Sequence, residues 1–219
     1  MKNSEESDLS KIVKNTGAAL FKFAAGPIGE LISGRLSRFS AERIESQFRG
    51  LNRRFERLKD RVIELDQVDE DFCDLFKSSY LVMVRSHKES KLRGASNIIL
   101  NGLLNEGDSE KCGFDELDLF VRVLDQLSYG AIEVLSELHM PEVQGTLTLD
   151  DFLHRRRASP DKLSEAFLME AKNLGFVEEN VDSTSRGRRD PVFSYRLSAI
   201  GERFVRRVID WRIDLCDGA

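Results

Sequence analysis

Three short stretches of sequence predict the C-terminal fold: Leu174-Gly175-Phe176-Val177, then Ser185-Arg186-Gly187-Arg188-Arg189, then Ser194-Tyr195-Arg196-Leu197. Gly175 can adopt the left-handed conformation that commonly ends a helix. The apolar residues on either side of the arginine-rich stretch predict two short strands, Phe176-Val177 and 192–197, joined by a basic turn. We therefore expect a helix, a two-stranded hairpin and a closing helix in this order.

Further helices are expected on both sides of the hairpin. Thr148 can cap a short helix that ends in Arg155-Arg156-Arg157, and Pro160 suits the first turn of the helix that ends at Leu174. Residues 199–215 predict the closing helix. This order is that of a winged helix. The segment resembles bacterial winged-helix regulators, whose third helix also ends in a Leu-Gly-Phe-type step and whose wing returns into a Tyr-x-Leu-Ser-x-x-Gly sequence.

Composition indicates a folded chain without a general attraction for polyanions. The chain has 219 residues, of which 41% are hydrophobic and 32% charged, and a net charge of -5 at pH 7. Binding to nucleic acid or anionic lipid would therefore need a local basic patch. Cys73, Cys112 and Cys216 lack metal-ligand spacing and predict free thiols in a reducing compartment, so we expect a cytoplasmic protein.

The N-terminal part predicts a helical module over residues 9–128, preceded by a flexible tail, 1–8. Its leader, 9–34, is rich in apolar and small residues, and Gly26-Pro27 should break it into two helices. A helical hairpin packed on the body is one interpretation of the leader. An interfacial segment that holds the protein at the periphery of the inner membrane is the other.

A strict heptad pattern follows the leader on an expected helix, 36–65. Apolar residues recur at spacings of four and three, which is the pattern of a helix that packs along a partner helix. Residues 72–103 can supply that partner within the chain, as an antiparallel hairpin. The same heptad residues are candidates for self-association or partner binding: Ile44, Phe48, Leu51, Phe55, Leu58 and Val62.

Two helical stretches of this module also resemble a known family. They run from Ser86 to Leu104, including Asn101-Gly102-Leu103-Leu104, and from Phe114 to Ser128. Their order is similar to that in the abortive-infection alpha family of bacterial helical proteins. The resemblance implies a role in phage defence and transfers no catalytic residues.

No arrangement of residues predicts a reaction, a cofactor or a metal site. His87, His139 and His154 have no companion at ligand spacing. Ser159 and Lys162 match a Ser-x-x-Lys pattern, but the other motifs of serine acyl-enzymes are missing. We therefore expect a non-enzymatic interaction protein of mainly α class, with a long helical hairpin followed by a winged-helix-like α+β domain over residues 129–219.

The alternative function is a DNA-binding regulator. The candidate contacts are six arginines placed before the long helix and in the wing: Arg155, Arg156, Arg157, Arg186, Arg188 and Arg189. Basic side chains at a wing tip suit phosphate contacts. The helix that would enter the groove, however, carries Asp161, Glu165 and Glu170, and carboxylates that face a duplex are repelled by it.

Overall fold

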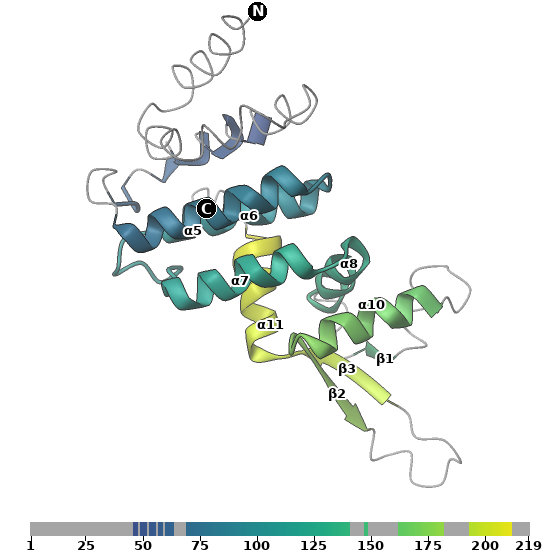
Figure 1. Cartoon of the computed structure of the whole chain (residues 1–219). Coiled ribbons are helices and arrows are strands. Elements are labelled where there is room, and N and C mark those ends of the chain that lie inside the picture. Colours follow the sequence, from purple (N-terminus) through teal and green to yellow (C-terminus); the bar gives the residue numbers. More distant parts are fainter. Residues whose placement is uncertain are drawn as a thin grey trace, which may run out of the picture. The chain divides into compact units, whose positions relative to one another are not determined.

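The computed structural model describes residues 46–47, 49–51, 53–55, 57–58, 60–63, 69–140, 147–148, 162–181 and 193–211. The described chain is mainly helical with one small antiparallel sheet (Figure 1). It divides into two compact units, which we call unit 1, Met1–Leu124 with Arg212–Ala219, and unit 2, Asp125–Trp211. The sequence places this boundary at Ser128.

Unit 1 is built on a helical hairpin of α5 (Glu70–Arg85) and α6 (Glu89–Gly102). Asp69 begins α5, because its side chain accepts a hydrogen bond from the Phe72 N–H at 2.9 Å. The two helices run antiparallel, since Gly102 near the end of α6 lies against Phe72 and Leu75 near the start of α5. Their facing apolar side chains form the core of the unit: Phe72, Leu75, Phe76, Val82, Met83, Leu92, Ala95, Ile98 and Ile99.

The heptad segment packs on this hairpin and ends earlier than the sequence predicts. The described residues from 46 to 57 are helical, whereas Arg61–Ile63 are not. Val62 instead forms an isolated antiparallel bridge with Leu104, flanked by main-chain hydrogen bonds of 2.8 and 2.9 Å. The Arg61 guanidinium also binds both carboxylate oxygens of Asp108, at 2.8 and 2.9 Å. The expectation of a helix to residue 65 is therefore wrong, because main-chain pairing competes with the helix there.

The connection after α6 is fixed by buried polar side chains. The Asn101 amide donates to the Glu110 carbonyl and accepts from the Cys112 N–H, each at 2.8 Å. The Lys111 ammonium donates to the carbonyls of Gly102 and Leu104 at 2.9 Å, where it neutralises the negative end of the α6 dipole. The next helix is α7 (Phe114–Gln126).

Unit 2 combines helices with a three-stranded sheet. Its elements are α8 (Tyr129–Leu138), β1 (Leu147–Thr148), α10 (Lys162–Asn173), β2 (Val177–Val181), β3 (Phe193–Leu197) and α11 (Ala199–Phe204), which continues as the π-helix η3 (Val205–Ile209). The strand order is β1-β3-β2, and both pairs are antiparallel. Thr148 pairs with Ser194 within this sheet, and the short helix expected after it lies outside the described residues.

The turn from α10 into β2 follows the sequence prediction. Gly175 has a φ of 81°, in the left-handed region. The Phe176 N–H bonds back to the Ala171 carbonyl at 3.1 Å and the Gly175 N–H to the Lys172 carbonyl at 2.9 Å. This pair of bonds satisfies the last carbonyls of α10 in a Schellman-type end. The glycine thus turns the chain directly from the helix into the sheet.

The closing helix is shorter than predicted. Ser198 caps its start, accepting from the Gly201 N–H at 3.1 Å. The chain then widens into the π-helix, and the Asp210 N–H bonds to the Val205 carbonyl at 2.8 Å. Asp210 and Trp211 are not helical. The expected helix therefore ends at Ile209 among the described residues, and residues 212–215 lie outside them.

Candidate interaction surface

The most distinctive surface of unit 2 is formed by α10 and the β2–β3 ribbon, and we call it the α10 face. The inner side of α10 is buried through Ser164, Leu168 and Ala171. Its outer side carries Ala166 and Asn173, both exposed, and the half-buried Met169. These three residues are spaced three and four apart, so they form one stripe along the helix. The stripe is uncharged. The sequence interpretation missed it, although the positions opposite the buried apolar residues of the helix could have revealed it.

Glu170 does not belong to the outer side of α10. Its carboxylate accepts the Ser128 N–H at 2.5 Å and the Ser128 hydroxyl at 2.7 Å. Ser128 is the N-cap of α8, and its oxygen also accepts from the Ala131 N–H. The negative charge is stabilised there by the positive end of the α8 dipole. The expectation that Glu170 faces a duplex is therefore wrong.

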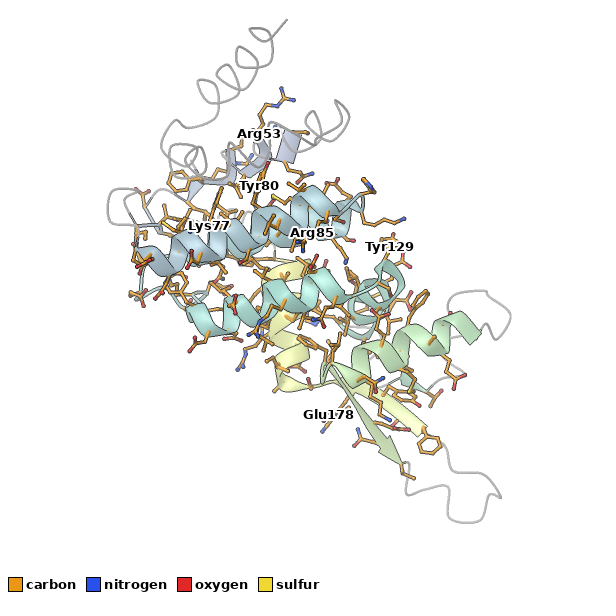
Figure 2. The ribbon with its side chains drawn as sticks, in the orientation of Figure 1. Arg53, Lys77, Tyr80, Arg85, Tyr129 and Glu178 are labelled. Atoms are coloured by element: carbon orange, nitrogen blue, oxygen red, sulfur yellow. The ribbon has the colours of Figure 1, made fainter. Side chains whose placement is uncertain are left out.

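The other charged groups around α10 are largely paired. Lys172 forms an ion pair with Glu179 and so ties the helix to β2. Glu178 and Arg196 form an exposed cross-strand ion pair of 2.8 Å, and Glu178 is labelled in Figure 2. Glu165 is exposed. Burial, and secondly the charge of Glu165, raise the pKa of Tyr195.

The ribbon ends in an apolar pair that leads into the arginine-rich connection. Val181 and Phe193 face each other across the strands. They are 62% and 38% exposed, while the equivalent pair at the other end of the ribbon, Val177 and Leu197, is buried. Arg186, Arg188 and Arg189 follow Val181 and precede Phe193 in the chain. They and Arg155, Arg156 and Arg157 lie outside the described residues.

Three of the four described heptad residues are buried in unit 1. Leu51, Leu58 and Val62 are 2%, 2% and 8% exposed, and Phe55 is half-buried. Ile44 and Phe48 are outside the described residues. The segment is joined to α6 by two side-chain hydrogen bonds, Gln47 to Glu89 at 2.8 Å and Arg54 to Asn97. Association of two chains through this seam would first have to expose core side chains.

The residues considered for catalysis do not come together in the described part of the chain. His87 is exposed at the end of α5, and His139 is half-buried at the end of α8. No group of three metal-ligating side chains occurs among the described residues. Burial raises the pKa of the half-buried Cys73 thiol, which lowers its thiolate fraction. His154, Ser159 and Cys216 lie outside the described residues.

Two further observations bear on function. Within the described ranges, every helix is too short or too polar to cross a bilayer. No family model matches the chain, and no curated protein or solved structure matches it either.

Proposed function

We propose that this protein is a non-enzymatic DNA-binding protein whose unit 2 is a winged-helix module. The observation that carries the proposal is the strand order β1-β3-β2, with α10 immediately before β2 and α8 before β1. A winged helix has this arrangement, because its recognition helix is followed directly by the two strands that hold the wing. The fold alone does not specify a ligand, so the surface must supply the argument.

The outer stripe of α10 has chemistry that suits a base-pair edge. The Asn173 amide can donate to and accept from the edge of an adenine, and the Ala166 methyl can contact the methyl group of a thymine. The stripe carries no carboxylate, and Glu170 is held at the N-terminus of α8. The repulsion expected from Glu170 is thereby reduced, whereas Glu165 is still exposed on α10.

The arginine-rich connection between β2 and β3 supplies the phosphate contacts in this proposal. Arg186, Arg188 and Arg189 are the charged residues that we assign to it, by their place in the chain between the two strands. Each phosphate neutralised by a basic side chain releases counterions, so the binding must weaken as the salt concentration rises. A chain with a net charge of -5 needs such a local patch to approach DNA.

The test is a salt series of fluorescence-anisotropy titrations with duplex DNA of mixed sequence. The variant replaces Arg186, Arg188 and Arg189 with alanine, and the matched control replaces three exposed arginines of unit 1: Arg49, Arg53 and Arg57. We expect the wing variant to reduce the slope of log affinity against log salt by about two to three, and the control to change it by less than about one. Equal effects of both variants, or no binding at low salt, would refute the proposal.

The competing function is association with a partner or a membrane surface through unit 1, with the role in phage defence that the family resemblance implies. Burial of Leu51, Leu58 and Val62 argues against those three residues as a contact surface. The other candidate region, the leader 9–34, lies outside the described residues. Flotation with anionic liposomes and light scattering test it directly. A monomer that neither floats nor captures a partner would exclude it, whatever the DNA result.

A further inference from the structure

Two apolar side chains are exposed together at the tip of the β2–β3 ribbon. Val181 at the end of β2 pairs with Phe193 at the start of β3. The Ser198 N–H bonds to the Phe176 carbonyl at 3.0 Å, at the other end of the ribbon. Hydrogen-bonded and non-hydrogen-bonded positions alternate along an antiparallel ladder, so Val181 and Phe193 occupy a non-hydrogen-bonded position, where facing side chains approach most closely. We call these two residues the tip pair.

The tip pair lies on the same side of the ribbon as α10. Side chains alternate between the two faces of a strand, so Val181 shares a face with Glu179 and Val177. Glu179 forms an ion pair with Lys172 of α10, and Val177 is buried. The same face of the ribbon is therefore covered at one end and exposed at the tip.

The ribbon next to the tip pair is an unbroken ladder. Residues 177–181 pair with residues 193–197 without a bulge. The Ser194 hydroxyl donates to the Asn180 carbonyl at 3.4 Å, and Arg196 and Glu178 form a cross-strand ion pair. An ordered ribbon loses little conformational entropy when a ligand covers its side chains.

The surroundings of the tip pair indicate which ligand covers it. Single exposed apolar residues are common on protein surfaces, and Leu81 in unit 1 is one of them. The two residues of the tip pair are instead adjacent, and they stand at the two ends of the connection that carries Arg186, Arg188 and Arg189. Two side chains offer far less surface than the roughly 800 Å² per partner that a stable protein interface buries. They fit better as one contact within a larger, charged interface.

We infer that the tip pair is an apolar contact for the minor groove of duplex DNA, in which Phe193 wedges against a base step. The inference rests on the proposed function, which assigns the arginines of the same connection to phosphates. Proteins that bind the minor groove insert apolar side chains, phenylalanine among them, between base steps and kink the duplex. Pyrimidine–purine steps such as TA are kinked most easily. The preferred ligand is therefore a duplex that contains a flexible step.

The experiment titrates the full chain with two duplexes of equal length, one with a central TA step and one with a central A-tract. Phe193→Thr removes the ring and keeps a residue that favours strands. Phe193→Leu keeps an apolar side chain. We expect the unchanged chain to bind the TA duplex about fivefold more tightly than the A-tract duplex, and Phe193→Thr to lose this preference by weakening TA binding about fivefold.

The matched control is Leu81→Gln. Leu81 is 42% exposed and Phe193 is 38% exposed, so both substitutions remove a similarly exposed apolar side chain. Phe193→Leu and Leu81→Gln should each keep TA binding within about twofold, because leucine also serves as a wedge and Leu81 lies outside the proposed contact. Each variant is compared at a temperature where its circular dichroism matches that of the unchanged chain. Equal losses in Leu81→Gln or in Phe193→Leu would overturn the inference.

The salt dependence separates the tip pair from the arginines. An apolar contact releases no counterions, so Phe193→Thr should leave the slope of log affinity against log salt within about 0.5 of its original value. A clearly smaller slope in Phe193→Thr would overturn the inference. A dimer seen by light scattering that Phe193→Thr converts to a monomer, with unchanged DNA affinity, would also overturn it and would assign the tip pair to a second copy of the chain.

Comparison with the triple-alanine wing variant separates this inference from the proposed function. If Phe193→Thr binds both duplexes as the unchanged chain does, while the wing variant lowers the salt slope, the inference falls and the proposed function stands. If Phe193→Thr loses the TA preference and the wing variant has no effect, the apolar contact stands and the assignment of the arginines falls. Absence of DNA binding by the unchanged chain at low salt would overturn both.

Discussion

The two units use different devices to fix their connections. In unit 1 the loop after α6 is held by polar side chains, with Asn101 and Lys111 bonded to main-chain atoms. In unit 2 the main chain itself comes into close contact. A Cβ at Gly201 would lie 2.1 Å from the Phe176 carbonyl oxygen, and one at Gly130 would lie 2.2 Å from the Phe167 ring. The loop after α6 in unit 1 therefore depends on hydrogen bonds that a substitution can remove, whereas the contact at Gly201 in unit 2 depends on space that a single methyl group would fill. A Cβ at Gly102 of unit 1 would lie 2.8 Å from a Leu75 side-chain carbon, which is a less severe contact than that with the Phe176 backbone.

The largest effect is expected from Gly201→Ala in unit 2. The added methyl would meet a backbone carbonyl, which cannot rotate away, so β3 and α11 would have to separate from the end of α10. We expect a loss of about 3 kcal/mol or more in the free energy of unfolding, measured by urea denaturation.

Gly50→Ala is the matched control in unit 1. Gly50 is also helical, and a Cβ there would have nothing within 4 Å. Because alanine favours helix over glycine, this change should stabilise the protein by roughly 0.5 to 1 kcal/mol. If both glycine substitutions changed the free energy of unfolding in the same direction, the contrast between the two units would be wrong.

Alkaline pH should weaken unit 1 through Tyr80. Burial raises the pKa of Tyr80 to about 12, whereas an unfolded tyrosine loses its proton near pH 10. Below pH 10 both states keep the proton, so stability is unaffected. Between about pH 10 and 12 the unfolded state binds fewer protons, and stability falls by about 2 to 3 kcal/mol.

The measurement compares urea unfolding of the unchanged chain and the Tyr80→Phe variant at pH 8, 10 and 11. Phenylalanine keeps the ring in the core and cannot ionise. The two stability curves should diverge above pH 10, with the variant losing less. Parallel curves across that range would show that the Tyr80 environment does not oppose ionisation.

A smaller loss in the free energy of unfolding is expected from Asn101→Ala, which tests the polar anchoring of the loop after α6 in unit 1. Asn101 is fully buried. Its removal would leave the buried Cys112 N–H and the Glu110 carbonyl without these bonds. We expect a loss of about 2 kcal/mol, together with faster hydrogen exchange at Cys112. Asn105→Ala, at a half-buried position in the same loop, should cost less than about 0.5 kcal/mol. Similar losses at both positions would argue against polar anchoring.

Local rules predicted the elements better than their ends. The left-handed Gly175 was predictable because a helix end next to a strand favours a residue without a Cβ. The end of the heptad segment was not, because Val62 leaves the helix to pair with Leu104, far along the chain. The closing helix also ends in a π-helix, which its apolar spacing does not predict.

The sequence by itself determined a mainly helical chain with a glycine-ended helix leading into a short ribbon, because helical periodicity and turn chemistry are local properties. It also determined where the basic residues stand along the chain. Only the tertiary structure decided which charged and apolar side chains remain at the surface. The Glu170 carboxylate is hydrogen-bonded at the start of α8, and Leu51 and Leu58 are buried in the core. Burial and long-range pairing depend on residues distant in the chain, so no local pattern can specify them.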